Sequence, residues 1–237
     1  MVKKELRLRH EAKYTIDYSS YLYLTQKIKG VLPLDKNAGV DGKYHIRTLY
    51  FDDYIDSALY EKEAGIAERK KYRIRIYDFK DGYIRLEKKI KKGDLVGKIN
   101  SVITIDQFYK IVDCRDLDFL IRSQDELLNE LYVKIRVDLL RPRIIVDYVR
   151  EAYTYHAGNI RITFDSDLKY STETSDIFSD SVQACSVPVD NKIILEVKYD
   201  NFIPDHIRYL LSIEGALKKS VSKYAICLAH YFRVRGY

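Results

Sequence analysis

Charged and apolar residues alternate along several short stretches of this chain, and the clearest example is residues 69–77, RKKYRIRIY. In that stretch Arg69, Lys71, Arg73 and Arg75 stand at every second position, mostly separated by apolar residues. Successive side chains of a strand point to opposite faces of its sheet. The pattern therefore predicts a strand with one cationic face.

The same alternation recurs in residues 85–89, 161–165 and 195–199. In a single strand, such a face is most simply a solvated outer face. A solvated face usually mixes charges of both signs with Ser, Thr and Gln, whereas these faces carry mainly Arg and Lys. Cationic faces turned toward each other repel unless a polyanion or interleaved carboxylates neutralise them. The recurrence therefore predicts a sheet curled around something negatively charged.

Helical spacing separates the predicted strands. Residues 18–30 place three apolar side chains on one helical face, and residues 105–140 have the spacing of a helical insertion. Residues 171–191 contain no Lys or Arg and are rich in Ser, Thr and Asp, so we expect a surface loop or hairpin excursion there. The expected strands are 5–16, 44–52, 69–79, 82–91, 94–103, 142–153, 159–165 and 192–199, and the other expected helices are 54–63, 204–213 and 221–233.

Local signals indicate where some of these elements begin and end. Asp81 and Gly82 form a dipeptide that favours a tight turn, which predicts a hairpin turn at residues 80–82. Asp52 or Asp53 can cap the helix that follows. Antiparallel strands with intervening helices predict the α+β class: an antiparallel β-tunnel, a closed barrel of about eight strands with helices packed outside. We expect residues 1–237 to form a single domain.

Composition narrows the class of protein. The chain has 237 residues with 41 basic and 35 acidic side chains, so its net charge of +6 comes from mixed charges and not from a histone-like excess. Three widely spaced cysteines and five histidines show no metal-ligand spacing, which argues against a disulfide framework and a zinc site. No signal peptide or membrane segment is visible. We expect a soluble cytoplasmic protein that does not bind DNA.

The N-terminal strand adds a candidate signature. Arg9, Glu11 and Lys13 share one face, which resembles the Glu-x-Glu-x-Lys signature of the triphosphate tunnel metalloenzymes, a CYTH-like superfamily. The whole chain is more closely similar to the VTC (vacuolar transporter chaperone) domain of polyphosphate polymerases. The resemblance rests on an ordered set of motifs in residues 11–14, 50–53, 72–77, 86–89, 148–152, 161–167, 195–198 and 222–224.

The resemblance implies an ATP-dependent polyphosphate polymerase, which transfers the γ-phosphate of ATP to a growing chain inside a basic tunnel and releases ADP. It implies a divalent cofactor, Mn²⁺ or Mg²⁺, held by Glu196. Arg9 stands where the wider signature has a first glutamate, which puts a two-metal hydrolase in doubt. The implied catalytic residues are Lys13, Arg73, Arg75, Arg150 and Arg161, and the implied substrate-binding residues are Lys89, Lys198, Lys223, Glu11 and Glu87.

These residue types suit that chemistry. Phosphoryl transfer passes through a loose transition state with charge spread over the phosphoryl oxygens, so positive charge and positioning do most of the catalysis. Arginine binds phosphate at two points and lysine acts as a mobile point charge. A hard divalent ion often needs only one or two carboxylates, because phosphate and water supply the other ligands.

Other interpretations stay open at this point. Lys13 and Lys198 can be surface lysines, and Glu11 and Glu87 can serve only to neutralise inward arginines. Asp165 can orient an arginine. The 22 tyrosines can stack on bases, although their spread over helices and strands favours packing. Two further functions compete with the polymerase: a triphosphate hydrolase on the same scaffold, and a non-catalytic module that binds a polyanion or RNA.

Overall fold

A computed structural model of the chain describes residues 6–175, 177–179, 182–187, 193–212 and 220–236. Strands and helices follow the predicted order with small shifts at their ends. The strands are β1 (Arg9–Ile16), β2 (Lys43–Asp52), β3 (Glu68–Tyr77), β4 (Lys80–Lys92), β5 (Leu95–Ile103), β6 (Arg141–Tyr155), β7 (Ile160–Ser171), β8 (Cys185–Ser186) and β9 (Ile193–Tyr199).

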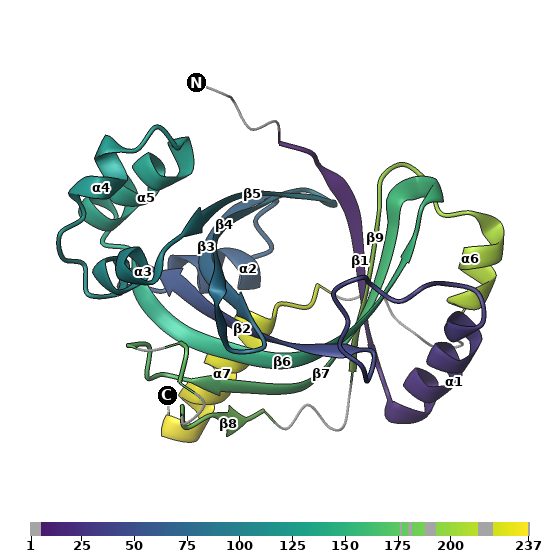
Figure 1. Ribbon diagram of the computed structural model, residues 1–237. Coiled ribbons are helices and arrows are strands. Elements are labelled where there is room, and N and C mark those ends of the chain that lie inside the picture. Colours follow the sequence, from purple (N-terminus) through teal and green to yellow (C-terminus); the bar gives the residue numbers. More distant parts are fainter. Residues whose placement is uncertain (1–5, 176, 180–181, 188–192, 213–219, 237) are drawn as a thin grey trace.

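Eight antiparallel strands form a closed barrel in the order β6-β2-β3-β4-β5-β1-β9-β7, and the pairing of β7 with β6 closes it. The short strand β8 extends the sheet beside β7. Figure 1 shows the sheet curving around a central space. The predicted closed antiparallel barrel is therefore confirmed. The helices are α1 (Tyr18–Lys29), α2 (Ser57–Glu63), α3 (Ile105–Val112), α4 (Asp118–Arg122), α5 (Glu126–Val137), α6 (Asp205–Leu210) and α7 (Lys223–Arg235), with a 3-10 turn η1 at Ala157–Asn159.

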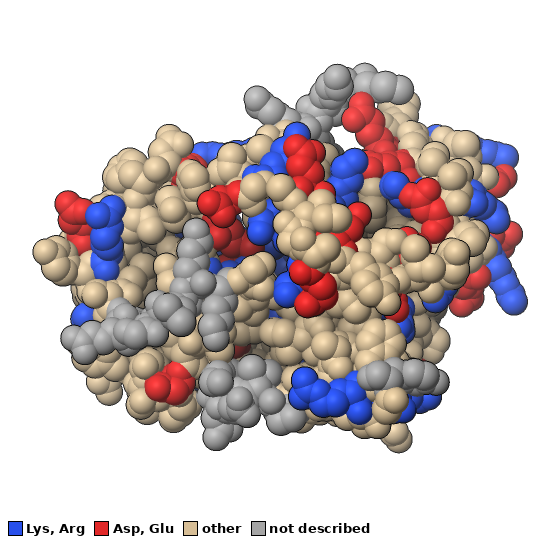
Figure 2. Space-filling view, turned by 180° about the vertical axis from the view of Figure 1, so that it is seen from behind, with Lys and Arg blue, Asp and Glu red and all other residues tan. Residues whose placement is uncertain are grey.

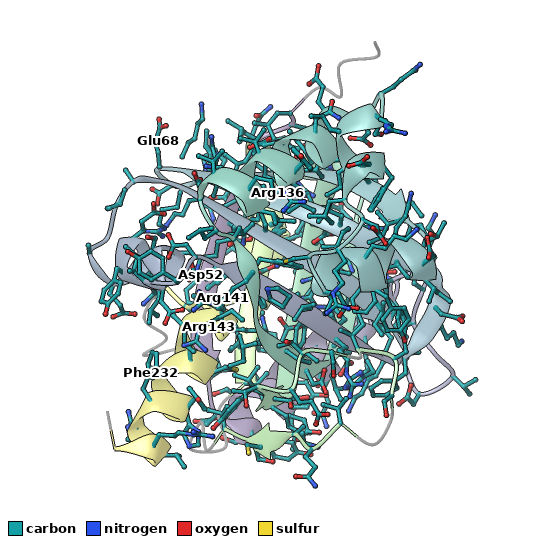
Figure 3. The ribbon with its side chains drawn as sticks, turned by 90° about the vertical axis from the view of Figure 1, so that its left-hand side faces the viewer. Asp52, Glu68, Arg136, Arg141, Arg143 and Phe232 are labelled. Carbon is teal, nitrogen blue, oxygen red and sulfur yellow. The ribbon has the colours of Figure 1, made fainter. Side chains whose placement is uncertain are left out.

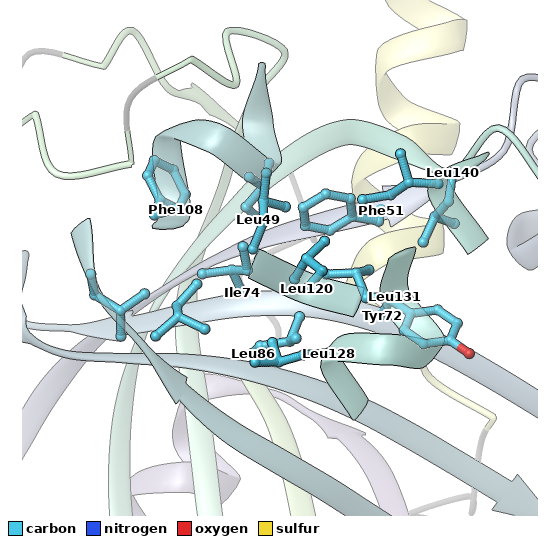
Figure 4. Packing of buried hydrophobic residues seen from close by; sticks show 14 of the residues in the cluster. Leu49, Phe51, Tyr72, Ile74, Leu86, Phe108, Leu120, Leu128, Leu131 and Leu140 are labelled. Carbon is cyan, nitrogen blue, oxygen red and sulfur yellow. The ribbon is translucent and has the colours of Figure 1, made fainter. Parts of the chain in front are cut away.

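The helices lie in separate groups around the barrel (Figure 1). The predicted helical insertion is α3, α4 and α5, which pack on the outward faces of β2, β3 and β4. Leu49, Ile74 and Leu86 from these strands meet Phe108 and Leu131 from the helices in one fully buried cluster (Figure 4). On another side, α1 and α6 cover β1, β7 and β9. The apolar half of each alternating strand thus faces helices and leaves the charged half to face inward.

Helix α7 packs differently from the others. Ile144, Val146 and Tyr148 share a face of β6 with Arg150, because they stand at every second position. The first three belong to the buried cluster that includes the α7 residues. Helix α7 therefore lies on the continuation of the tunnel-lining face, and its first residue, Lys223, reaches the tunnel.

A cation joins α7 to the sheet. Arg143 of β6 pairs with Asp56, Nε to Oδ1 at 2.6 Å, and its guanidinium lies 5.5 Å from the ring centre of Phe232. Figure 3 shows Arg143 beside α7, with Asp52 and Arg141 close by at the ends of β2 and β6. The far end of α7 is thus fixed to the same sheet that its first residue approaches.

The hairpin between β3 and β4 turns earlier than the sequence indicated. We predicted the turn at residues 80–82, but it consists of Asp78 and Phe79, both left-handed with φ of 49° and 56°. Asp78 accepts a hydrogen bond from the backbone N–H of His45 at 2.8 Å, and the Phe79 ring stacks on the His45 ring at 4.2 Å. Contacts with β2 therefore override the local preference of the Asp-Gly dipeptide.

The carboxylates before α2 cap it as predicted. Asp52 accepts from the backbone N–H of Ala58 at 3.0 Å, and Asp53 accepts from that of Ser57 at 2.9 Å. The helix begins at Ser57, three residues later than expected. Each cap satisfies an N–H group that the first helical turn leaves without an intrahelical partner.

Part of the expected surface loop at 171–191 lies outside the described residues. Within the described part, Ile177 is fully buried against the cluster that holds α3 to the barrel, and Cys185–Ser186 pairs with β7. This excursion therefore contributes to the core as well as to the surface. None of the helices in the described part of the chain is long and apolar enough to cross a membrane.

Candidate active site

A tunnel passes through the barrel. Two cavities of about 320 and 750 Å³ share the side chains of Glu11, Arg73, Arg75, Lys89, Arg150 and Lys198 in their walls, so they are two halves of one passage. We call the smaller half the α7 end, because Lys223 lines it, and the larger half the hairpin end, because the β3–β4 hairpin lines it. Lys13 and Glu196 line only the α7 end, and Arg161 lines only the hairpin end.

The predicted cations thus converge from six strands and one helix. Every second residue of the ladder in β3 lines the tunnel, as the alternation indicated. Figure 2 shows one face of the molecule on which Lys and Arg gather with Asp and Glu around a recess. Of the predicted site residues, Glu87 alone is absent from the described tunnel lining.

Strand register brings two carboxylates and two lysines together between β1 and β9. Lys13 lies opposite Glu196, and Glu11 lies opposite Lys198. The Lys13 ammonium is 3.2 Å from Glu11 Oε1 and 3.1 Å from Glu196 Oε2. Lys198 lies 2.5 Å from Glu196 Oε1 and 3.5 Å from Glu11 Oε2. The two lysines therefore bridge the same pair of carboxylates.

This arrangement keeps Glu196 ionised although it is only 3% exposed. Burial alone raises the pKa of a carboxyl group, but Lys198 and Lys13 outweigh that effect and hold the pKa of Glu196 well below its usual range. Lys89 also contacts Glu11, with its Nζ at 3.0 Å from Oε1. Burial nevertheless lowers the pKa of Lys89 to about 7. A phosphate placed beside Lys89 favours its charged form.

Arg73 and Arg75 share one fully buried carboxylate, Glu87. Arg73 donates to Oε2 of Glu87 from Nε at 2.8 Å and from Nη2 at 2.6 Å, and Arg75 Nη1 lies 3.7 Å away. Lys98 and Arg85 also lie within 4 Å of Glu87. Four cations around one buried carboxylate leave surplus positive charge at the tunnel wall. The geometry favours charge compensation over ligand contact for Glu87.

Asp165 orients a third arginine. Its two oxygens accept from Nε and Nη2 of Arg150, and Lys223 Nζ lies 2.5 Å from Oδ2. Burial opposes ionisation of Asp165, yet Arg150 and Lys223 lower its pKa to about 2. The register places Asp165 directly opposite Arg150. The arginine-orienting role considered for Asp165 agrees with these contacts.

Arg161 stands apart from this central group. Its Nη1 lies 2.6 Å from Oδ2 of Asp35, and its Nη2 donates to the hydroxyl of Tyr44 at 2.7 Å. Of these two partners, Tyr44 also lines the hairpin end. Arg161 lines the hairpin half and not the α7 half, so it lies away from the centre that the two halves share.

Several lining residues were not among the predicted site residues. Tyr50 accepts from Arg73 Nη1 at 3.2 Å, and Tyr148 accepts from Arg75 Nη2 at 3.3 Å. Both tyrosines line the α7 end, where their hydroxyl groups hold the two guanidinium groups in place. Tyr148 stands two positions before Arg150, so the alternation already contained a signal for it. Lys71 and Lys91 likewise continue the alternation of Arg73 and Lys89.

Of the predicted site residues, Glu196 and Glu11 are the carboxylates that can hold a divalent ion. Both line the α7 end and present oxygen atoms, the ligand type that Mg²⁺ and Mn²⁺ accept. Within the described residues, no three His, Cys, Asp or Glu side chains form a site that is complete by itself. The donor set therefore fits an ion whose remaining ligands are phosphate oxygens and water.

Two solved structures are similar to this barrel. A candidate adenylyl cyclase from Hippeastrum, described as having a dominant triphosphatase activity, matches with a TM-score of 0.55 at 15% identity, over 94% of this chain and 95% of that one. A candidate adenylate cyclase from Bacillus halodurans matches with a TM-score of 0.49 at 12% identity, over 87% of each chain. No curated protein matches the sequence.

At 15% identity the likeness to the Hippeastrum protein shows the fold alone, a closed antiparallel tunnel barrel. The sequence itself matches a family model, the VTC domain, over residues 8–232. That range includes every predicted site residue. With the match spanning nearly the whole chain and the basic tunnel formed as expected, the chain belongs to the VTC domain family.

Proposed function

We propose that this protein is an ATP-dependent polyphosphate polymerase that works inside the tunnel. The observation that carries the proposal is the continuity of the basic passage: its two halves share Arg73, Arg75, Lys89, Arg150 and Lys198, and cations continue beyond this centre in both directions. One triphosphate needs only part of that length. The remainder can hold a second polyanion, the growing chain.

The central cations hold the transferred phosphoryl group. Arg73, Arg75 and Arg150 are preorganised by Glu87 and Asp165, so they need no reorientation as charge shifts during the reaction. The bond from the γ-phosphorus to the β,γ-bridging oxygen breaks, and a bond forms from that phosphorus to a terminal oxygen of the chain. ADP carries away the electron pair of the broken bond.

Glu196, with Glu11 beside it, is the proposed ligand for Mn²⁺ or Mg²⁺. When bound, such an ion neutralises charge on the phosphate oxygens. Lys13 and Lys198 pair with the oxygens of Glu196 in this structure, and an ion held by Glu196 would leave both lysines available to contact phosphate. Unlike Glu87 and Asp165, which pair with cations from positions outside the cavity lining, Glu196 lines the cavity itself, where its oxygens can reach a bound ion. This position supports the enzyme over the binding module.

A triphosphate hydrolase is the second candidate. The Hippeastrum protein of the same fold is described as a triphosphatase. A hydrolase must admit water to the γ-phosphate, whereas a polymerase must keep an acceptor phosphate there. Arg9, in place of a first glutamate, pairs with Asp200 at 2.9 Å and offers no carboxylate for a second metal ion.

Products distinguish these functions. The protein is incubated with ATP and Mn²⁺ or Mg²⁺, and the products are resolved by gel and by nucleotide chromatography. The proposal expects ADP together with a polymer that an exopolyphosphatase digests, with no product from the Arg73→Ala/Arg75→Ala variant. Orthophosphate without polymer indicates the hydrolase, and absence of ADP with either metal indicates the binding module.

A further inference from the structure

The proposed reaction adds phosphate to a chain that already exists, so it needs a first acceptor. Four described side chains in the wall of the α7 end carry a hydroxyl group: Tyr50, Tyr148, Ser220 and Ser222. The two tyrosine hydroxyls accept hydrogen bonds from Arg73 and Arg75. Arginine stays protonated in proteins, so neither of these neighbours can take a proton from a tyrosine.

Ser222 differs from the tyrosines because a lysine lies beside its hydroxyl group. Nζ of Lys71 is 3.4 Å from Oγ of Ser222 and 4.6 Å from the ring centre of Tyr224. Both of these contacts are to groups without a full charge, and no carboxylate lies within 4 Å of this nitrogen among the described residues. Ser220 lines the same cavity but is exposed, and no lysine of the described chain lies within hydrogen-bond distance of its hydroxyl.

The surroundings of Lys71 favour its neutral amine. Burial lowers the pKa of Lys71 to about 7, and the charges of Arg69, Lys13 and Lys62 act in the same direction, while Asp52 opposes the shift. A neutral amine has a lone pair that can accept the proton of an alcohol, and an ammonium has none. Lysines that act as general bases have a pKa brought down to this range. The lysine and the neighbouring hydroxyl therefore have the arrangement of a general base and a nucleophile.

The residues on either side of Ser222 belong to the proposed reaction site. Lys223, the next residue, is one of the predicted phosphate-binding cations and lines the cavity. The carbonyl oxygen of Val221 accepts a hydrogen bond from Nζ of Lys13 at 3.2 Å, and the same nitrogen lies 3.1 Å from Glu196. Ser222 thus lines the cavity in which the triphosphate of ATP is proposed to bind.

We propose that Ser222 is the first phosphoryl acceptor, which makes the protein the primer of its own polymer. Oγ of Ser222 bonds to the γ-phosphorus of ATP, the bond from that phosphorus to the β,γ-bridging oxygen breaks, and ADP leaves with the electron pair. The hydroxyl proton passes to Nζ of Lys71. In later turnovers a terminal oxygen of the phosphate on Ser222 takes the place of the hydroxyl. The identity of the phosphoryl donor rests on the proposed function.

The position of Ser222 also suits the product. Ser222 is the N-cap of α7, and its Oγ accepts a hydrogen bond from the backbone N–H of Ala225 at 3.4 Å. The first N–H groups of a helix and the helix dipole favour a phosphate placed at this end. The proton that Lys71 takes up also leaves an ammonium beside the new phosphate. The phosphorylated serine therefore gains a cationic partner at the moment that it forms.

A labelling experiment tests the acceptor. The full chain is mixed with ATP that carries a radioactive γ-phosphate and with Mn²⁺ or Mg²⁺, stopped with denaturant after short times and run on a denaturing gel. The expected result is label on the protein that resists acid, is released by alkali and maps to the peptide holding Ser222. Phosphoserine has this stability, whereas a phosphoramidate on a lysine is lost in acid, so the treatment separates Ser222 from Lys71 as the acceptor.

Three serine variants separate the hydroxyl from the helix cap. Ser222→Asn keeps a capping side chain for α7 but has no hydroxyl, so it should carry no label and make no polymer from ATP alone. Added tripolyphosphate, which can accept phosphoryl groups in place of the serine, should restore its polymer formation. Ser222→Thr keeps a hydroxyl and should keep the label. Ser220→Ala removes the neighbouring hydroxyl and should be labelled as fast as the unchanged protein.

Lys71→Arg tests the base, because arginine keeps the positive charge but does not lose its proton. Labelling should slow by about a hundredfold, as expected when a general base is lost. The affinity for tripolyphosphate, measured by calorimetry, should stay within about twofold, since the cationic charge remains. Labelling as fast as in the unchanged protein would overturn the role of Lys71.

The products show which hypothesis fails. Polymer formed from ATP without labelled protein, or label that persists in Ser222→Asn, overturns the acceptor role and leaves the polymerase standing. Labelled Ser222 together with orthophosphate and no polymer rejects the polymerase and leaves the acceptor role standing. Absence of both ADP and label with either metal rejects both.

Discussion

Asp165 holds Arg150 at the tunnel wall through two parallel hydrogen bonds, Nε to Oδ1 at 2.6 Å and Nη2 to Oδ2 at 2.7 Å. The same carboxylate reaches Lys223, the first residue of α7. One buried group thus joins β6, β7 and α7. Its negative charge is also what allows two cations to stay buried side by side without a ligand.

Asp165→Asn is expected to lower the free energy of unfolding by about 3 kcal/mol, because it leaves Arg150 and Lys223 buried without compensation. Saturating tripolyphosphate should restore part of this loss, since the phosphate supplies the missing negative charge. Urea unfolding with and without tripolyphosphate measures both effects. Asp167→Asn is the control, because Asp167 is more than half exposed and pairs only with Lys169 in the described structure. Equal losses in the two variants contradict this role of Asp165.

Arg73→Ala and Arg75→Ala should each lower turnover by roughly a hundredfold or more, as expected when one preorganised charge contact of about 3 kcal/mol is lost from a transition state. Folding should survive, because three cations stay near Glu87 after either change. Steady-state kinetics and circular dichroism test this. Lys70→Ala, an exposed cation on the opposite face of β3, should keep normal turnover. Near-normal activity in both arginine variants would show that these side chains do not act on phosphate.

Glu196→Gln should abolish metal-dependent turnover while leaving triphosphate binding in the absence of metal as strong as before or stronger. The change removes the proposed metal ligand, and it also frees Lys13 and Lys198 from their carboxylate partner. Calorimetry with tripolyphosphate in a chelating buffer measures the binding. Glu151→Gln, an equally buried carboxylate bonded to Tyr21 on the outer wall, controls for loss of a buried charge. Weaker metal-free binding by a folded Glu196→Gln protein argues for a structural pairing role instead.

Binding of a phosphate chain near pH 8 should take up protons. Burial lowers the pKa of Lys71 and of Lys89 to about 7, so both are largely neutral at that pH before binding. A bound polyanion favours their charged forms, and affinity should therefore fall as pH rises from about 7 toward the ordinary lysine pKa of about 10.4. Calorimetry in buffers of different ionisation enthalpy counts the protons. Lys71→Gln/Lys89→Gln should take up fewer; unchanged uptake would assign the protons to other groups.

The alternating pattern predicted the lining residues well because the geometry of a strand is strict. If Arg73 and Arg75 face inward, Lys71 and Arg69 must face inward too, because they stand at every second position of the same strand. The structure places all four in the tunnel lining. The pattern does not reveal which cation has a partner. Glu87 lies two positions before Lys89 and shares its face, yet it is covered by Arg73 and its neighbours. Such pairing depends on contacts between strands that sequence spacing does not contain.

The hairpin shows the other limit of sequence reasoning. Asp81 and Gly82 form the stronger turn signal, but they lie within β4. The choice of Asp78 and Phe79 depends on His45, which is 33 residues away from Asp78 in the chain. A turn that is fixed by a neighbouring strand cannot be found from its own residues. The capping of α2, by contrast, was predictable because the capping carboxylates lie only a few residues before the helix, although the helix itself begins three residues later than expected.

The N-terminal strand β1 is joined to β9 by seven residue pairs and to β5 by two. Its main neighbour is therefore synthesised last among the barrel strands, after residue 192. Until then Lys13 lacks Glu196 across the strands, and the wall of the tunnel has a gap. A nascent chain consequently displays its cations separately, and the wall that pairs Lys13 with Glu196 forms only after β9 has been synthesised. The proposed phosphate site is thus incomplete in any fragment that ends before β9.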